Sequence, residues 1–312
     1  MQAGPNELRL PDFIIGGAPK CATSSLHFIL AQHEEIGIPD RELHFFDADD
    51  PVTHPDFFRI DRRRLVAPDN DATDGPLFRR YSEHFRPFQD ARFIGEDSTT
   101  YLMSEVAAAR IKRMLPDAKL VFMLRDPVAR AWSQYWHLVR SGRATVSFER
   151  ALSAHPAIVL GSTYARSLSR YFELFGRDRV KVALFEDLTG DTRSTVDSVT
   201  DFIGAQRFGA GLIDTWFNRT AYPLVPNMEL LLNRVRRHLV KGRYRRHLGG
   251  SGGRLGMLAD RAVQSLVPTT TRAPRMAEST RAYLTRHLSQ RNLGLSKLLD
   301  RDLSEVWKGF TG

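Results

Sequence analysis

The sequence predicts an α/β domain with a P-loop-like, three-layer fold, in which helices flank a central parallel sheet. The apolar run "KLVFML" at 119–124 has the length of a strand and no polar alternation, which is typical of a parallel strand covered on both faces. Strand-like and helix-like segments also alternate along much of the chain, and this alternation builds parallel sheets. A strand, a glycine-rich loop and a helix start follow one another at 13–32.

The strand-then-helix order allows the elements to be assigned in turn. We expect strands at 13–16, 92–97, 119–124 and 179–188, and helices at 23–32, 102–115, 128–141, 161–176 and 192–204. In open parallel sheets, ligands bind at the carboxyl ends of the strands. This rule brings the 17–25 loop, residues 97–99 and residues 125–126 to one site.

The size allows one large α/β domain or two small ones, and the composition is ordinary for a soluble globular protein; we expect a single domain over 1–312. The 312 residues are 42% hydrophobic and 26% charged. We expect a core over 11–205, a variable basic and glycine-rich segment over 221–275, and a C-terminal helix and tail over 276–312 that pack on the core. No run approaches the about 18 apolar residues of a membrane span. The N-terminal residues lack the pattern of a signal peptide, so we expect a cytoplasmic protein.

The loop "GGAPKCATSS" at 16–25 predicts a site for a phosphate-like group. Backbone N–H groups and the dipole of the following helix favour anions. A Walker A loop requires G-x-x-x-x-G-K-[ST], whereas Lys20 follows Pro19 and the hydroxyl groups begin three residues later. A plain glycine–proline turn is the alternative. The groups available for an anion come from Gly16, Gly17, Lys20, Thr23, Ser24 and Ser25.

Several segments resemble the sulfotransferases that use 3′-phosphoadenosine 5′-phosphosulfate (PAPS), in particular the heparan-sulfate-type and bacterial carbohydrate sulfotransferase-like branch. They occur in the order of that family and cover most of the chain outside 48–90 and 221–275. The segments are "GAPKCATSSLHFIL" at 17–30, "RELHFFD" at 41–47, "FIGEDSTTYL" at 93–102, "KLVFMLRDPVARAWSQYWH" at 119–137, the helix–strand unit at 161–188 and "RDLSEVW" at 301–307.

The resemblance implies a set of PAPS-binding residues. Arg125 and Ser133 would contact the 3′-phosphate, and Tyr164 would belong to the same site. An arginine at a strand end can grip phosphate with two hydrogen bonds, and Ser133 follows Arg125 by about two helical turns. The loop around the 5′-phosphosulfate would consist of Gly17, Ala18, Pro19, Lys20, Cys21, Ala22, Thr23, Ser24 and Ser25.

Sulfuryl transfer needs a base for the acceptor hydroxyl and positive charge at the leaving group. The resemblance implies that Glu42 is the base. An extended backbone would place His44 on the same face, where it can orient the base or the substrate. Lys20 would bridge the 5′-phosphate and the sulfuryl group. A surface glutamate beside a packed histidine is the alternative interpretation.

We expect no metal, because no residue cluster has metal-ligand spacing and the reaction requires none. His54 and His84 are interpreted as surface or structural residues. Cys21 is the only cysteine, which excludes an internal disulfide and a cysteine-based zinc site. The cluster of Trp132, Tyr135, Trp136 and His137 is interpreted as core packing in preference to an adenine stack.

The net charge of +9 favours anionic partners. Eight Lys or Arg residues and no acidic residue lie between Arg234 and Arg254. This segment has three interpretations: a solvated helix face, a cover over PAPS, or a contact with a membrane surface through 228–247. Within it, Lys241 and Arg243 resemble a Lys-Gly-Arg sequence of the eukaryotic enzymes. The sequence does not predict the oligomeric state.

The function predicted from these features is transfer of a sulfuryl group from PAPS to a hydroxyl of a carbohydrate, glycolipid or natural product. Asp97 occupies a position where many eukaryotic relatives carry lysine, which argues against simply assuming a heparan acceptor. An atypical P-loop kinase is the alternative enzyme. A nucleic-acid binder is supported by charge alone, and we expect no nucleic-acid partner.

Overall fold

A central parallel sheet organises the molecule. The computed structural model describes residues 9–73, 75–209, 222–244 and 267–312, without the side chains of 59–61 and 237–244. Within these residues, five parallel strands pair in the order β2-β5-β1-β6-β7. They are β1 (Phe13–Gly17), β2 (Ile36–Gly37), β5 (Phe93–Asp97), β6 (Lys119–Leu124) and β7 (Val180–Leu184).

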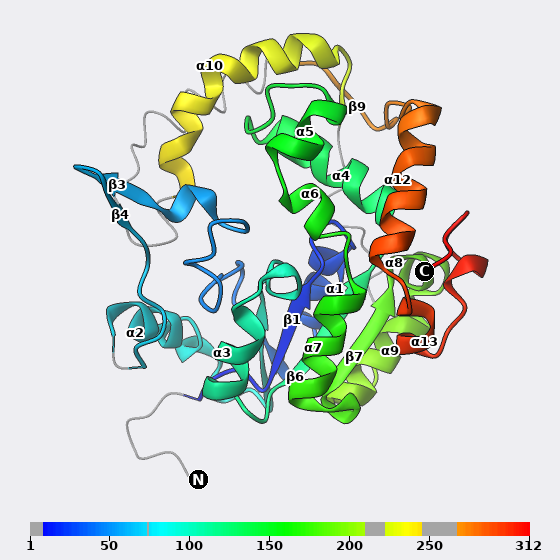
Figure 1. The fold of residues 1–312 in the computed structure, drawn as a ribbon. Coiled ribbons are helices and arrows are strands. Elements are labelled where there is room, and N and C mark those ends of the chain that lie inside the picture. Colours follow the sequence, from blue (N-terminus) through cyan, green and yellow to red (C-terminus); the bar gives the residue numbers. More distant parts are fainter. Residues whose placement is uncertain (1–8, 74, 210–221, 245–266) are drawn as a thin grey trace.

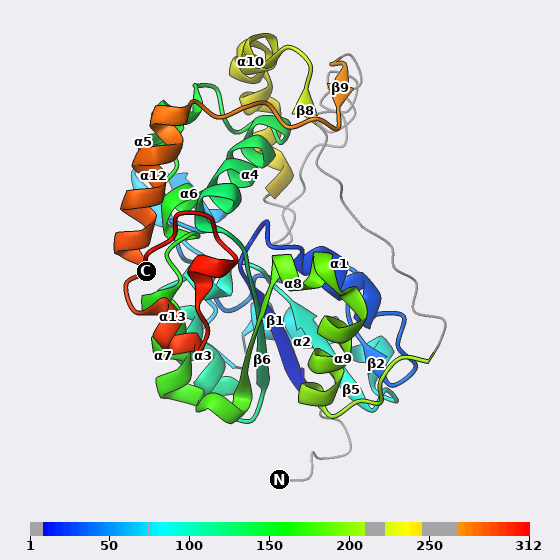
Figure 2. The same ribbon diagram turned by 90° about the vertical axis from the view of Figure 1, so that its right-hand side faces the viewer.

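Helices cover both faces of the sheet, which confirms the predicted three-layer α/β fold. Figure 2 shows α3 (Ala107–Met114) and α7 (Ala165–Phe175) on one face, and α1 (Thr23–Leu30) and α9 (Thr192–Ile203) on the other. The central strands β1 and β6 are almost completely buried, as the unbroken apolar run of β6 predicts.

A second group of helices lies beyond the carboxyl ends of the strands (Figure 1). It has its own hydrophobic cluster, which includes Trp136, Phe148 and Leu284 from three different helices. The C-terminal tail packs on the main core through Leu303 and Trp307, both fully buried. The helices of this group are α4 (Pro127–Arg140), α5 (Phe148–Ala154), α6 (Ala157–Leu160), α10 (Pro226–Tyr244) and α12 (Glu278–Arg291).

The remaining elements are short. They are the hairpin β3 (Arg59–Asp61) and β4 (Arg64–Val66), the pair β8 (Tyr222–Pro223) and β9 (Thr269–Thr270), and helices α2 (Pro76–Glu83), α8 (Phe185–Gly190) and α13 (Leu295–Leu299). Turns of 3₁₀-helix occur at Pro55–Phe57, Arg86–Phe88, Tyr101–Met103, Arg177–Arg179 and Leu303–Glu305. Among the described residues, none of the helices is both long and apolar enough to cross a membrane.

Three expected boundaries are wrong. The helix expected over 161–176 begins only at Ala165. The strand expected over 179–188 ends at Leu184, because its neighbour β6 ends at the paired Leu124 and offers nothing beyond it to pair with. The helix expected over 102–115 begins only at Ala107. The preceding turn is 3₁₀-helical, and the hydroxyl of Tyr101 in that turn donates a 2.5 Å hydrogen bond to the buried Glu96.

Much of the expected variable segment 221–275 falls outside the described residues, because 245–266 are not described. The side chains of Lys241 and Arg243 also lie outside the described part of the chain.

Candidate active site

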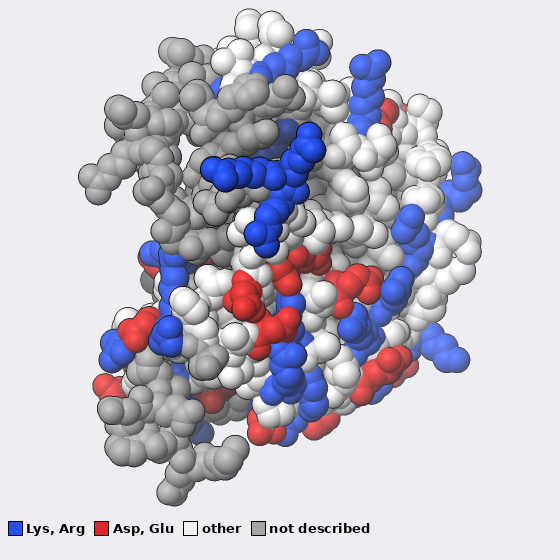
Figure 3. Space-filling view, turned by 60° about the vertical axis from the view of Figure 1, so that its left-hand side comes forward, with Lys and Arg blue, Asp and Glu red and all other residues white. Residues whose placement is uncertain are grey.

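The site lies at the carboxyl ends of the central strands, where the sequence places it. The Arg125 guanidinium, just after β6, donates a 3.3 Å hydrogen bond to the carbonyl oxygen of Lys20 in the loop after β1. The backbone N–H of Ser98, just after β5, donates to the carbonyl of Ile15 in β1. Basic side chains project over a hollow on one face of the molecule, and acidic side chains gather just below them (Figure 3).

The loop between β1 and α1 has the form of an anion site. Lys20 and Ala22 both adopt left-handed backbone conformations, at φ 72° and 66°, which cost non-glycine residues about 1 kcal/mol each. Gly17 has φ 137°, and a Cβ atom there would lie 2.4 Å from the carbonyl oxygen of Thr99. Ala22 precedes α1 and has no side chain to cap its first N–H groups. These N–H groups and the helix dipole favour an anionic ligand.

Arg130 holds this loop in place. It is completely buried on α4, and it donates hydrogen bonds to the carbonyl oxygens of Pro19 at 2.9 Å and Ile158 at 2.9 Å. Gly161 leaves room for it, because a Cβ atom there would lie 2.3 Å from the guanidinium. No motif in the sequence identified Arg130, since its partners lie far from it along the chain.

Replacing Arg130 with Met is expected to lower the free energy of unfolding by about 3 kcal/mol, because several buried carbonyl groups lose their donor. Urea denaturation followed by circular dichroism measures this change. Arg150→Met, at an exposed position of α5, is the matched control and should leave the free energy of unfolding almost unchanged. A loss as small as that of the control would contradict the role of Arg130.

Lys20 lies among positive charges. Burial lowers its pKa to about 8, together with the charges of Arg140, Arg130 and Arg125, while the nearby Glu42 raises it. Burial and the charge of Lys20 also lower the pKa of His137 on α4 to about 3, so this imidazole is neutral at pH 7. A lysine whose pKa is lowered by neighbouring cations indicates positive potential that a bound anion would stabilise.

The predicted base and its neighbour form a direct contact. The Nε2 atom of His44 lies 2.9 Å from Oε2 of Glu42, and the hydroxyl of Thr99 donates a 2.9 Å hydrogen bond to Oε1. Burial raises the pKa of Glu42, but the hydrogen bond and charge of His44 outweigh it and hold this pKa at about 2. Burial lowers the pKa of His44, and the same contact with Glu42 outweighs that effect and raises it. The Glu42 side chain is 34% exposed, so a substrate can reach it.

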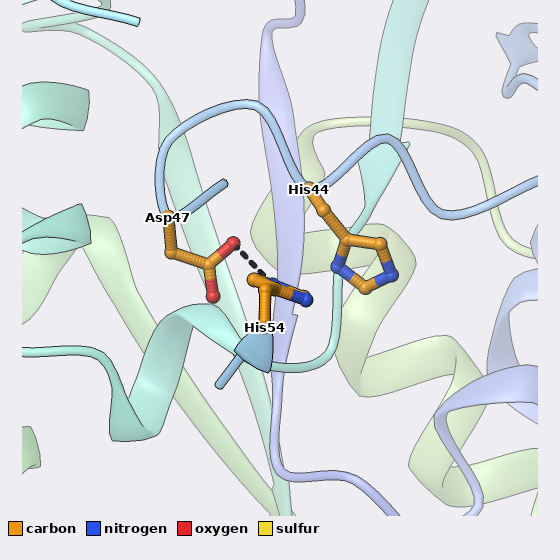
Figure 4. A group of neighbouring side chains, drawn as sticks. All are labelled: His44, Asp47 and His54. Carbon is orange, nitrogen blue, oxygen red and sulfur yellow. Dashed lines mark hydrogen bonds and ion pairs between the residues drawn. The ribbon is translucent and has the colours of Figure 1, made fainter. Parts of the chain in front are cut away.

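A second histidine extends this pair into the protein. Nδ1 of His44 and Nε2 of His54 each lie 3.2 Å from the hydroxyl oxygen of Thr100, and Nε2 of His54 lies 2.9 Å from Asp47 (Figure 4). The hydroxyl of Thr100 also hydrogen-bonds Asp47 and helps to lower the pKa of this buried carboxyl. A hydroxyl has one proton to donate, so Thr100 accepts a hydrogen bond from His44 when it donates to Asp47.

This arrangement also bears on metal binding. Among the described residues, His44, Asp47 and His54 offer ligand atoms within 4.8 Å of one another, which could hold a metal ion. The hydroxyl of Thr100 already bridges the two imidazoles, so hydrogen bonding accounts for their positions. We expected His54 to be a surface or structural residue; it is only 7% exposed and lies one hydrogen bond from Thr100.

The turn that carries Glu42 and His44 is fixed by the end of β5. The hydroxyl oxygen of Ser98 accepts hydrogen bonds from the N–H groups of Leu43 and His44, at 3.1 and 2.9 Å, and donates to Glu96 at 2.8 Å. Burial raises the pKa of Glu96 to about 7. Through Ser98, the segment "FIGEDSTTYL" therefore holds the segment "RELHFFD" in place.

Asp97 points to a different neighbour. It lies 3.3 Å from Nδ1 of His27 on α1, and both side chains are 6% exposed. Burial raises the pKa of Asp97 to about 6, and the charge of Glu42 contributes to this rise. The position therefore adds no positive charge to the site.

Of the other predicted PAPS-binding residues, Arg125 and Tyr164 are linked to the same loop by hydrogen bonds. The hydroxyl of Tyr164 donates a 2.9 Å hydrogen bond to the carbonyl of Arg125, whose guanidinium lies 4.1 Å from the centre of the Phe185 ring. Cys21 is buried, and burial raises the pKa of its thiol to about 12. Ser133 is buried on α4, and its contact with a ligand stays a prediction. Tyr135 and Trp136 belong to the second hydrophobic cluster, as expected for core packing.

Known proteins are similar to this chain in sequence. Residues 11–208 match the model of a family described as "Sulfotransferase family". Human bifunctional heparan sulfate N-deacetylase/N-sulfotransferase 2 is 26% identical over 319 residues, covering 94% of this chain and 30% of the human protein. Human heparan sulfate glucosamine 3-O-sulfotransferase 6 is 27% identical over 217 residues, covering 66% of this chain and 56% of the human protein. This chain thus spans less than two thirds of the length of either relative.

A solved structure has a similar fold over nearly its whole length. The sulfotransferase from Alicyclobacillus acidocaldarius is 28% identical, and the alignment covers 96% of this chain and 99% of that one with a TM-score of 0.62. The arrangement of sheet and helices described above therefore also occurs in a solved sulfotransferase.

Proposed function

Because this chain belongs to the sulfotransferase family, we propose that it transfers a sulfuryl group from PAPS to a hydroxyl of an acceptor, giving a sulfate ester and 3′,5′-ADP. One observation carries the proposal: Glu42 accepts a hydrogen bond from Thr99, and the backbone carbonyl of Thr99 packs against Gly17 of the loop, so the predicted base lies beside the loop. A donor phosphosulfate held by the loop would thus have a base beside it. The family match does not favour the kinase alternative.

The residues of this chain fit PAPS as a substrate. The left-handed loop, the uncapped N-terminus of α1 and the lowered pKa of Lys20 all favour a bound anion. PAPS would supply the activated sulfuryl group. Arg125, Ser133 and Tyr164 are proposed to lie at its 3′-phosphate end, and residues 17–25 at its 5′ end.

The proposed reaction assigns a role to each side of the site. The acceptor oxygen forms a bond to sulfur while the bond between sulfur and the bridging phosphate oxygen breaks. Glu42 takes the proton of the acceptor hydroxyl, and Lys20 stabilises the negative charge that develops on the departing phosphate oxygen. His44 holds the carboxylate of Glu42 in position through their 2.9 Å contact.

The acceptor is proposed to be a hydroxyl of a carbohydrate, glycolipid or natural product. The two human relatives are named for heparan sulfate. Asp97 is buried against His27 and contributes negative charge when ionised, which favours an acceptor with less negative charge than heparan. A cytoplasmic location with peripheral membrane contact through 228–247 is part of the proposal.

Incubation with PAPS and a panel of glycans, glycolipids and phenols tests this function. Mass spectrometry should find a product that has gained one sulfuryl group, together with 3′,5′-ADP. Turnover of ATP with Mg²⁺, or tighter binding of ATP than of 3′,5′-ADP, would instead support the kinase.

Replacing Thr100 with Val is expected to lower kcat about tenfold, because His44 loses the acceptor that orients its Nδ1–H. The affinity for 3′,5′-ADP should stay unchanged, as Thr100 lies on the side of His44 away from Glu42. Thr100→Ser keeps the hydroxyl and should restore most of the activity. Steady-state kinetics of the three proteins measures the effect, and equal activity of the Val and Ser variants would exclude this role.

A further inference from the structure

Over residues 226–236, whose side chains the structure describes, helix α10 (Pro226–Tyr244) buries a polar face and exposes an apolar one, the reverse of the usual arrangement. Glu229, Asn233 and Arg236 are 4%, 0% and 1% exposed. Met228, Leu231 and Val235 are 55%, 59% and 70% exposed. The second set is spaced by three and four residues, so its members lie in a row along one side of the helix.

Specific contacts fix this orientation. Asn233 donates hydrogen bonds to the carbonyl oxygens of Val139 and Ala144, at 2.7 and 2.9 Å. Arg236 forms a 2.6 Å ion pair with Glu229 and donates to the carbonyl of Arg140. Rotating α10 to bury its apolar row would break these bonds and leave buried polar groups without partners. The apolar row is therefore held outward.

The exposed row continues onto the residues before the helix. Leu224 and Val225 are 57% and 50% exposed. Exposed apolar patches of this kind mark contacts with proteins or membranes, because water disfavours them. Figures 1 and 2 place α10 beyond the carboxyl ends of the strands, and the helix contacts both α4 and the Pro55–Phe57 turn beside His54. The patch therefore lies at the same end of the molecule as the candidate active site.

The apolar row could contact a membrane or a second copy of the chain. The charge of residues 234–254 favours the membrane. Besides Arg236, which is paired with Glu229, the sequence from Arg234 to Arg254 contains seven Lys or Arg residues and no acidic residue. A symmetric dimer built on the apolar row would join two chains that each carry this excess of positive charge, and their repulsion opposes it. An anionic membrane surface attracts the basic residues and accepts apolar side chains at the same time.

We propose that α10 docks on an anionic membrane surface, with Met228, Leu231 and Val235 inserted at the boundary between headgroups and acyl chains. This inference rests on the proposed peripheral contact and assigns it to a defined face of one helix. Docking would hold the active site beside the bilayer, where a lipid-linked acceptor carries its hydroxyl groups.

Sedimentation with lipid vesicles tests the proposal on the full chain. The protein should pellet with vesicles of phosphatidylcholine and phosphatidylglycerol, and remain in solution with phosphatidylcholine alone. Salt should weaken the binding. The double variant Leu231→Ser/Val235→Ser should bind the anionic vesicles at least about tenfold more weakly. Leu293→Ser is the matched control, since Leu293 is 58% exposed and lies outside α10.

Binding of 3′,5′-ADP by each variant shows whether it is folded and separates this inference from the proposed function. Absence of vesicle binding by a protein that binds 3′,5′-ADP would overturn the membrane contact and leave sulfuryl transfer standing. Equal vesicle binding by the double variant and the wild type would also overturn it. If sedimentation velocity shows that the wild type is a dimer and the double variant a monomer, the apolar row serves self-association instead.

Discussion

Replacing Glu42 with Gln is expected to lower kcat for sulfuryl transfer about a thousandfold, the range found when a general base is removed. The amide keeps the size of the side chain, and its single oxygen can accept the hydrogen bond of Thr99 or that of His44, which bond different oxygens of Glu42. The amide cannot take a proton from the acceptor hydroxyl. The affinity for 3′,5′-ADP should change little, because the proposed nucleotide contacts come from residues 17–25 and from Arg125.

Steady-state kinetics and calorimetric titration of 3′,5′-ADP measure the two quantities on the same preparation. Glu34→Gln changes an exposed glutamate in the same way and should be fully active. If Glu42→Gln retains activity, the base lies elsewhere, with His44 as the next candidate. If it loses both activity and nucleotide binding, Glu42 supports the loop and its role as base is not established.

Local sequence patterns predicted the elements that carry the site. The strand β6 occupies 119–124 as expected, because a continuous apolar run of this length fits a parallel strand covered on both faces and is too short for a buried helix. The loop after β1 was predicted from its glycines and Lys20. Rules for parallel sheets then sufficed to bring Arg125 to the same edge.

The contacts that hold the site together had no such signal. His54 and Thr100 lie 46 positions apart and meet through one hydrogen bond. Arg130 contacts Pro19, 111 positions away. No local sequence pattern distinguishes His54, Thr100 or Arg130 from other polar residues of a helix or loop. Such contacts depend on how the segments pack in three dimensions, which a single sequence does not encode in a short motif.

The reversed face of α10 illustrates the same limit. From the sequence, the basic content of 228–247 allowed a solvated face, a cover over PAPS or a membrane contact. The structure adds that Arg236, one of the basic residues, is buried in an ion pair with Glu229. Charge counting treats all arginines alike, whereas the fold uses this one as an internal anchor and exposes Leu231.

Replacing Lys20 with Ala is expected to weaken binding of 3′,5′-ADP about a hundredfold, because a phosphate loses its charged partner in a partly desolvated site. Arg125→Ala should weaken it to a similar extent. The affinity of the wild type should itself depend on pH. The pKa of Lys20 is lowered to about 8, so the free protein loses this positive charge as the pH rises through 8, and the affinity falls.

Titration of 3′,5′-ADP between pH 7 and pH 9 measures this dependence, which follows from the pKa of about 8. The fall in affinity above pH 8 should disappear in Lys20→Ala, because the titrating group is gone, and should persist in Arg125→Ala. Lys308→Ala, at an exposed position of the C-terminal tail, should behave as the wild type. If Lys20→Ala and Arg125→Ala both bind 3′,5′-ADP as tightly as the wild type, the nucleotide does not bind at this loop. A pH dependence that survives in Lys20→Ala would assign the titrating group to another residue, even if the nucleotide binds where proposed.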